Sequence, residues 1–199
     1  MTKDANANTQ EIEAVFIEIN KDEIEEKLKK VGAKKIKDIH YKITAYDFKD
    51  KRLDKDNSWV RLRDDGERVK MTFKKRLGVT SQDGTTNDSG MEEVEVAVDD
   101  YESTRLFLNK IGLIEKHETE KKRTRWQKGS VIFDIDTWPS IPTYLEIEAN
   151  SWDDIDSGAK LLGLNPDDKK VCSANQIYMI YGMNMSDYQK IKFDRMVKK

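Results

Sequence analysis

The sequence predicts an α+β protein: a closed eight-stranded antiparallel β-barrel, or tunnel, with a charged interior and helices packed on the outside. Seven stretches alternate charged with aliphatic residues, as strands with two different faces do. Within each stretch the charges have one sign, and capped helical segments are available to cover the aliphatic faces. The charged faces must then meet one another or water, and about eight strands suffice to close a barrel around a small ligand.

The charged faces are sorted by sign along the chain. The acidic pairs are Glu11/Glu13, Glu93/Glu95, Asp134/Asp136 and Glu146/Glu148, and the basic sets are Arg61/Arg63, Lys70/Lys74/Arg76 and Lys121/Arg123/Arg125. A salt-bridged or solvated sheet explains any single stretch. For all of them together we favour a ligand, because buried ion pairs are weak stabilisers and costly to desolvate. Carboxylates suit Mg²⁺ or Mn²⁺, and Arg and Lys suit phosphate oxygens, so the pattern fits a metal-bound polyphosphate.

The first half of the chain holds a disordered start, one helix and several strands. Asn20 is the expected N-cap of the helix, Glu23 stands at the capping-box position, and Gly32 ends it. The expected elements are a disordered segment 1–9, a strand 11–19, a helix 20–32, a strand-like segment 34–48, a polar turn 50–57, and strands 58–63 and 69–74, with Arg76 extending the basic row.

The second half begins with a long polar loop and contains the acidic hairpin. Asp99 or Asp100 caps a second helix that ends at Gly112, and prolines mark the turn of the hairpin. The expected elements are a mobile loop 78–90, strands 93–98 and 118–127, hairpin strands 130–138 and 143–149, helices 152–162 and 173–181, and an amphipathic helical tail 183–199. Residues 10–182 then form one domain.

Composition narrows the class of protein. The chain has 199 residues, of which 37% are charged, yet its net charge is only −2, so a nucleic-acid-binding surface is not expected. The single cysteine, Cys172, excludes a disulfide framework. No segment reads as a membrane span or a signal peptide. We therefore expect a cytoplasmic protein, monomer or homodimer, whose partner is a small-molecule triphosphate rather than a membrane.

Taken in order, the motifs resemble those of CYTH domains, the triphosphate tunnel metalloenzymes. The residues that carry the resemblance are Glu11-Ile-Glu13, Trp59-Val-Arg-Leu-Arg63, Thr72-Phe-Lys74, Glu93-Val-Glu95, Lys121-Lys-Arg123, Asp134-Ile-Asp136 and Leu145-Glu-Ile-Glu148. The resemblance spans roughly residues 10–182. It implies an eight-stranded tunnel that binds a triphosphate among basic residues and a divalent metal among glutamates.

The resemblance also implies roles for individual residues. Metal ligands would be Glu11, Glu13, Glu146 and Glu148, with Asp136 as a further acidic contact. Phosphate ligands would be Arg61, Arg63, Lys74 and Arg123, with Lys121 and Arg76 beside them. A second metal would use Glu93 and Glu95, and the catalytic set would be Glu11, Glu13 and Glu148.

The chain departs from the family's opening ExExK motif at one position. Val15 stands where the motif has its lysine. Lys70 or Arg125 is a candidate to supply the missing charge.

The function that we predict is metal-dependent hydrolysis of inorganic, nucleoside or thiamine triphosphate. The alternatives are a class IV-like adenylyl cyclase that makes cyclic AMP, and a module that binds polyphosphate or nucleotide without turnover, which Val15 favours. The products distinguish the first two, and the absence of turnover identifies the third. His40 and His117 are isolated and are interpreted as structural or surface residues.

Overall fold

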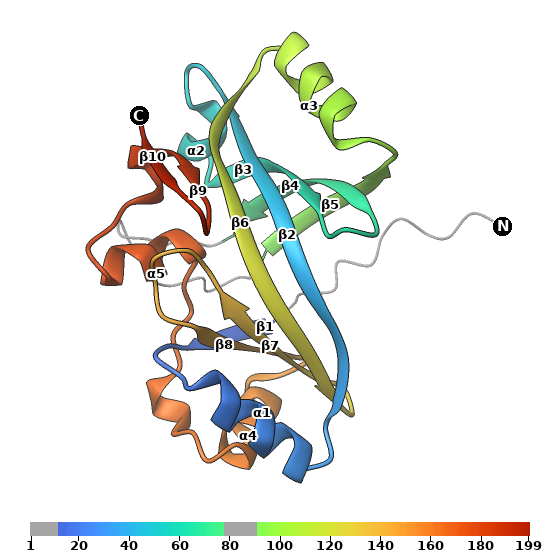
Figure 1. Ribbon diagram of the computed structural model, residues 1–199, viewed down its shortest axis with the longest axis vertical. Coiled ribbons are helices and arrows are strands. Elements are labelled where there is room, and N and C mark those ends of the chain that lie inside the picture. The colour runs from blue at the N-terminus through green and yellow to red at the C-terminus, as the bar shows by residue number, and fades with distance from the viewer. Residues whose placement is uncertain (1–11, 78–90) are drawn as a thin grey trace, which may run out of the picture.

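Two long antiparallel strands form the spine of the molecule (Figure 1). The computed structural model describes residues 12–77 and 91–199. Within them, β2 (Lys34–Phe48) pairs along its length with β6 (Leu113–Lys128). The main sheet has the strand order β1-β8-β7-β6-β2-β3-β4-β5. Every neighbouring pair on this path is antiparallel, as the alternating sequence predicts.

Three strands extend the sheet on each side of the spine. On one side lie β7 (Val131–Thr137), β8 (Tyr144–Ala149) and β1 (Ile12–Phe16). On the other lie β3 (Ser58–Asp64), β4 (Val69–Arg76) and β5 (Met91–Val98). The strands expected from the sequence are therefore present, and the acidic hairpin is β7–β8.

The sheet is a curled half-barrel, and the expected closed barrel is wrong. Among the described residues β1 and β5 stand at the two ends of the strand order, and no ladder joins them. The outer edge of β1 pairs instead with a single later residue, through the antiparallel bridge between Val15 and Lys170.

Helices cover the outer face of the β1–β8–β7 side. α1 (Lys21–Lys30) and α4 (Trp152–Leu161) pack there over a cluster that includes Phe133, Ile135 and Ile147. Asn20 caps α1 by accepting from two backbone N–H groups, as predicted. On the opposite side of the molecule α3 (Tyr101–Lys110), capped by Asp100, covers a second cluster.

The segment expected to be a polar turn contains a short helix, α2 (Arg52–Lys55). Its N-terminal N–H groups donate to the carboxylate of Asp47: Leu53 N at 3.0 Å and Asp54 N at 3.0 Å. Asp47 is buried, so the charged residue that precedes the turn holds the helix in place.

The C-terminal tail is a β-hairpin, and the expected helix over residues 183–199 is wrong. After η1 (Pro166–Asp168), α5 (Ala174–Ile180) and η2 (Met185–Asp187) come β9 (Tyr188–Ile191) and β10 (Met196–Lys198). β9 pairs in parallel with β6 at Glu118 and Thr119, beyond the region where β7 pairs with β6. This free stretch of β6 supplies hydrogen-bond partners that a helix would leave unpaired.

None of the helices in the described ranges is long and apolar enough to cross a membrane.

Candidate functional site

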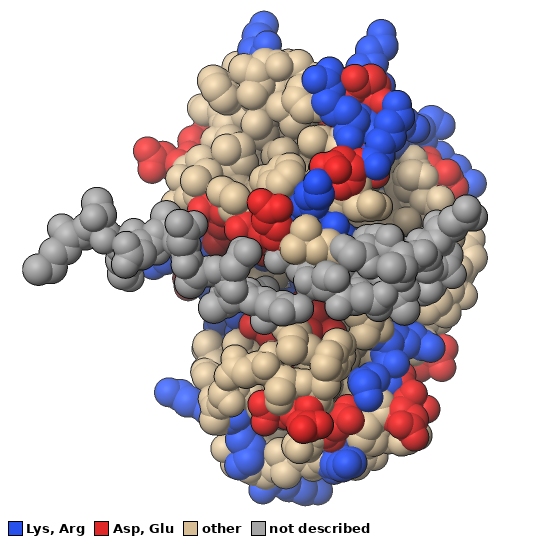
Figure 2. Space-filling model, turned by 180° about the vertical axis from the view of Figure 1, so that it is seen from behind, with Lys and Arg blue, Asp and Glu red and all other residues tan. Residues whose placement is uncertain are grey.

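The inner face of the curled sheet carries the sorted charges. The ladder registers place Glu13 opposite Glu148, Arg123 opposite Asp136 and Lys74 opposite Glu93. Partners across a ladder project from the same face, so the charged residues of seven strands line one surface. Seen from behind in Figure 2, acidic and basic side chains lie next to each other near the middle of this face and over its upper part.

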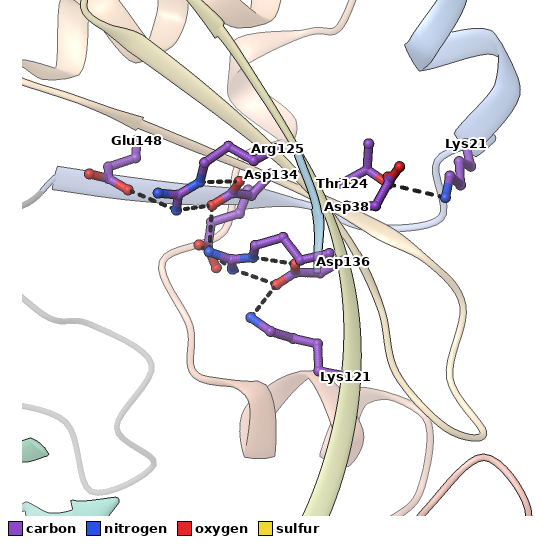
Figure 3. A network of polar contacts seen from close by, with 10 residues as sticks. Lys21, Asp38, Lys121, Thr124, Arg125, Asp134, Asp136 and Glu148 are labelled. Atoms are coloured by element: carbon purple, nitrogen blue, oxygen red, sulfur yellow. Dashed lines mark hydrogen bonds and ion pairs between the residues drawn. The ribbon is translucent and has the colours of Figure 1, made fainter. Parts of the chain in front are cut away.

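Arg123 on β6 is the centre of a buried ion-pair network. Figure 3 shows Asp134 and Asp136 of this network with Lys121 and Arg125 beside them. Its Nε and Nη2 donate to the two carboxylate oxygens of Asp136, each at 2.6 Å. Nη2 also donates to Glu146 Oε1 at 2.8 Å, and Nη1 donates to Asp134. Arg123 is 8% exposed and both aspartates are 1% or less. The bidentate geometry holds three carboxylates around one guanidinium.

Two more basic residues of β6 extend this network. Lys121 Nζ donates to Asp136 Oδ2 at 2.9 Å, and Arg125 Nε donates to Asp134 Oδ1 at 2.8 Å. Burial lowers the pKa of Lys121, and the charge of Arg123 lowers it further. Burial acts to raise the pKa of Asp136, but the charges of Arg123 and Lys121 outweigh it and the net shift is downward. Asp136 is therefore a structural carboxylate that its basic neighbours keep ionised.

The other end of the inner face has a second, more open set of charges on β3, β4 and β5. Lys74 Nζ lies 2.6 Å from Glu93 Oε2, and Lys70 Nζ lies 2.5 Å from Glu95 Oε1. Thr72 Oγ1 donates to Glu95 at 3.3 Å. Glu93 and Glu95 thus hold basic side chains in place, and a second metal at these residues stays a prediction.

Arg61 and Arg63 each keep a spare hydrogen-bond donor. Their ion pairs are long: Arg61 Nη2 lies 3.9 Å from Glu93, and Arg63 Nη2 donates to Glu95 at 3.5 Å. Each side chain is 20% exposed, and each has a buried Nε–H without a hydrogen-bond partner among the described residues. Burial lowers the pKa of Arg61 to about 10, with the charge of Arg63 acting in the same direction. Spare guanidinium donors of this kind suit an anion with several acceptor oxygens.

Arg76 connects the two ends of the open sheet. It extends from β4, where its Nη1 donates to Gln176 Oε1 of α5 at 3.4 Å. Burial lowers the pKa of Arg76, whereas the charge of Glu13, on β1, acts to raise it. An electrostatic effect between β1 and β4 requires that the curl brings these distant strands near each other. Arg76 and Glu13 therefore belong to one charged surface although the barrel is open.

The predicted metal ligands lie on one face but do not form a cluster. Glu13 and Glu148 face each other in register, and Glu146 is two residues along β8. No group of three or more Asp, Glu, His or Cys side chains in the described part of the chain converges to hold a metal ion. The donors suit a hard cation in type, since all are carboxylate oxygens. Asp136 is already engaged by Arg123 and Lys121, and Glu11 lies outside the described residues.

Val15 is 3% exposed and packs in an apolar cluster with Tyr41, Trp138 and Tyr178. Both residues proposed to supply the missing charge are engaged in ion pairs. Lys70 is paired with Glu95, and Arg125 is paired with Asp134.

Sequence reasoning missed Tyr41, whose ring lies 5.0 Å from the Arg63 guanidinium and 5.2 Å from Lys121 Nζ. The sequence could have predicted this position, because Tyr41 alternates with the outward residues of β2 and so falls on the inner face.

The two histidines take no part in the charged network. His40 is exposed, with its Nε2 3.8 Å from Glu120. Burial lowers the pKa of His117 to about 4, so this ring is neutral at physiological pH.

Comparison with known proteins agrees with this geometry. The model of the CYTH domain family matches residues 9–168. No curated protein matches the chain significantly.

Several solved structures share the fold at low identity. A conserved hypothetical protein from Pyrococcus furiosus has a TM-score of 0.68 at 18% identity, covering 84% of this chain and 99% of its own. A putative adenylate cyclase from Vibrio parahaemolyticus has a TM-score of 0.70 at 13% identity, covering 87% and 99%. A putative adenylyl cyclase from Hippeastrum, described as having a dominant triphosphatase activity, has a TM-score of 0.59 at 12% identity, covering 86% and 95%. With its family match over most of the sequence and its charge-lined, curled sheet, the chain belongs to the CYTH domain family.

Proposed function

We propose that the inner face binds a triphosphate and that the protein hydrolyses its terminal phosphoanhydride bond with Mg²⁺ or Mn²⁺. The observation that carries the proposal is the pair of buried, unpartnered Nε–H groups of Arg61 and Arg63. Buried donors are normally satisfied, and an anion with many acceptor oxygens satisfies several at once. The putative adenylyl cyclase from Hippeastrum, described as a triphosphatase, supports this reaction class by analogy.

The basic residues divide into two roles. Arg61, Arg63 and Lys74 face the open part of the inner surface and would contact the phosphoryl oxygens, with Arg76 completing the row. Arg123 already donates to three carboxylates, so its first role is to position Glu146 and the two aspartates. As the terminal phosphoryl group transfers to water, negative charge spreads over its oxygens, and fixed guanidinium groups stabilise that charge without reorganisation.

The acidic edge formed by β1 and β8 would hold the metal. Glu13, Glu146 and Glu148 offer carboxylate oxygens from adjacent strands. A bound divalent ion would neutralise phosphate charge and lower the pKa of a bound water. Water attacks the terminal phosphorus, the bridging P–O bond breaks, and orthophosphate leaves together with the shortened polyphosphate. No protein nucleophile is needed.

The test is phosphate release from inorganic triphosphate, ATP and thiamine triphosphate, with Mg²⁺, Mn²⁺ or EDTA. We expect Glu148→Gln and Arg61→Met each to lower kcat/KM at least about a hundredfold, since each removes a charge from the transition-state environment. Arg52→Met is the matched control, because Arg52 pairs with Asp50 at the surface, with its side chain 61% exposed. Undiminished hydrolysis by both site variants would refute the assignment.

An adenylyl cyclase is the second candidate, because the similar structure from Vibrio parahaemolyticus is described as a putative adenylate cyclase. Product analysis with ATP separates the two reactions: a cyclase releases pyrophosphate and cyclic AMP, and a hydrolase releases orthophosphate. Binding of triphosphate without any turnover would identify a binding module. Val15→Lys is expected to raise the activity of a hydrolase and to leave a pure binding module inactive.

A further inference from the structure

Lys170 joins the sheet at the edge of the acidic strands. Val15 N donates to Lys170 O at 2.8 Å, and Lys170 N donates to Val15 O at 2.9 Å. Two residues that exchange both hydrogen bonds form a directly opposed antiparallel pair, and their side chains project from the same face of the sheet. Val15 shares its face with Glu13, two residues earlier on the same strand. The side chain of Lys170 therefore belongs to the inner face.

The ladder registers place Lys170 in a row of inner-face residues. Lys170 is opposite Val15, Val15 is opposite Glu146, and Glu146 is opposite Asp134. Neighbouring strands are about 4.8 Å apart, so the backbone of Lys170 is roughly 10 Å from that of Glu146. In that row the apolar Val15, itself buried, lies between them. A lysine can lay its four-carbon stem over such a residue and carry its ammonium to the charged centre.

The environment of the neighbouring Cys172 is consistent with this orientation, which rests on the bridge between Val15 and Lys170. Two residues after Lys170, it projects from the same side of the chain when the segment is extended. Burial raises the pKa of the Cys172 thiol, the charges of Lys170 and Arg76 oppose that rise, and Glu13 adds to it. Cys172 thus lies within electrostatic range of Arg76 and Glu13, on the side of the chain that Lys170 shares.

Lys170 is also a cation that no described carboxylate holds. It is exposed, and within residues 12–77 and 91–199 no ion pair of Lys170 is found. The nearby Arg125 is held by Asp134, and Lys70 is held by Glu95. The sequence offered no signal for this role, because Lys170 lies beyond residues 9–168 that match the family model and far from Val15 along the chain.

We propose that Lys170 contacts the terminal phosphoryl group of a bound triphosphate, beside the carboxylates of Glu13 and Glu146. The proposal rests on the proposed function of the inner face and adds to it a ligand from outside the family-matched segment. Lys170 places a mobile positive charge at the position that Val15 leaves apolar. Its ammonium neutralises the phosphoryl oxygens that would otherwise face the acidic edge.

The test is calorimetric binding of inorganic triphosphate to the full chain in EDTA, followed by the same titration with Mg²⁺. We expect Lys170→Met, which keeps the length of the stem, to weaken binding about ten- to a hundredfold, as loss of a charge-assisted contact does. Lys170→Arg is expected to bind within about threefold of the parent chain. The control is Lys169→Met, since Lys169 pairs with Asp156 of α4 at 2.9 Å and is expected to leave binding unchanged.

Restoring a lysine on β1 provides the second arm of the experiment. Val15→Lys combined with Lys170→Met is expected to recover most of the lost affinity, because the new ammonium starts from the opposed position. If the buried Val15 does not tolerate lysine, as a lowered melting temperature would reveal, Lys170→Glu supplies the readout and is expected to bind more weakly than Lys170→Met. Parent-like binding by Lys170→Met overturns this inference alone. A parent chain that binds no triphosphate overturns the proposed function as well.

Discussion

Replacing Asp136 with asparagine is expected to lower the free energy of unfolding by about 3–5 kcal/mol, because it breaks a buried ion-pair network at its centre. Asp136 is fully buried and accepts two hydrogen bonds from Arg123 at 2.6 Å and one from Lys121 at 2.9 Å. Each charge-assisted bond contributes about 1.5–3 kcal/mol. Asparagine keeps one acceptor oxygen, and Arg123 keeps its bonds to Asp134 and Glu146, so the loss is smaller than the sum.

Urea unfolding followed by circular dichroism measures this loss, and the slope with denaturant checks that the unfolded state is unchanged. Asp56→Asn is the matched control. Asp56 also accepts from a lysine, Lys75, at 2.8 Å, but its side chain is 59% exposed, so the same chemical change should cost about 0–1 kcal/mol. If Asp136→Asn costs no more than Asp56→Asn, the network is not desolvated and the reasoning about the buried inner face is wrong.

Three further predictions follow from the packing and charges of the described residues. The pKa of Asp136 is lowered in the folded state. Its contribution to the free energy of unfolding is therefore complete above about pH 4 and is lost as the pH falls through the folded pKa. Urea midpoints should drop in acid less steeply for Asp136→Asn than for the parent. A Cβ at Gly158 would lie 3.4 Å from the Phe133 ring, so Gly158→Val should overpack the contact between α4 and the sheet and cost about 1–3 kcal/mol in urea unfolding, whereas Gly158→Ala should cost less. Tyr178→Phe removes the 2.7 Å bond to the buried carbonyl of Pro139 and should lower stability by about 1–3 kcal/mol, and an unchanged melting temperature would contradict that bond.

Local alternation was enough to predict which side chains face inward. Asp134 and Asp136 lie on the charged face, while Phe133 and Ile135, 0% and 1% exposed, pack under the helices. The period of two decides this for each strand alone, without knowledge of its neighbours. The capping residue Asn20 was predictable for the same reason, since a cap depends only on adjacent backbone N–H groups.

Features that depend on distant segments were not predictable. The open sheet was not predictable, because pairing between β1 and β5 depends on distant segments, as does the bridge between Val15 and Lys170. The tail folds as a hairpin because β6 continues beyond β7 and leaves an edge that β9 fills, with Ile191 fully buried. The amphipathic composition of the tail suits a helix as well as a hairpin, and only the free edge of β6 decides between them. The partners of Arg123 likewise depend on strand order, which the sequence did not establish.

The pairing of β1 with β8 has a consequence for how the protein folds. Ile12 is opposite Ala149, so the earliest described strand cannot dock until the hairpin of β7 and β8 exists. Closing so long a loop costs entropy before any contact is gained, whereas β6, β7 and β8 follow one another with short turns and can form first. A chain in that intermediate state leaves the hydrogen-bonding edge of β8 bare, and two such edges can join between molecules. Refolding yield should therefore fall as protein concentration rises.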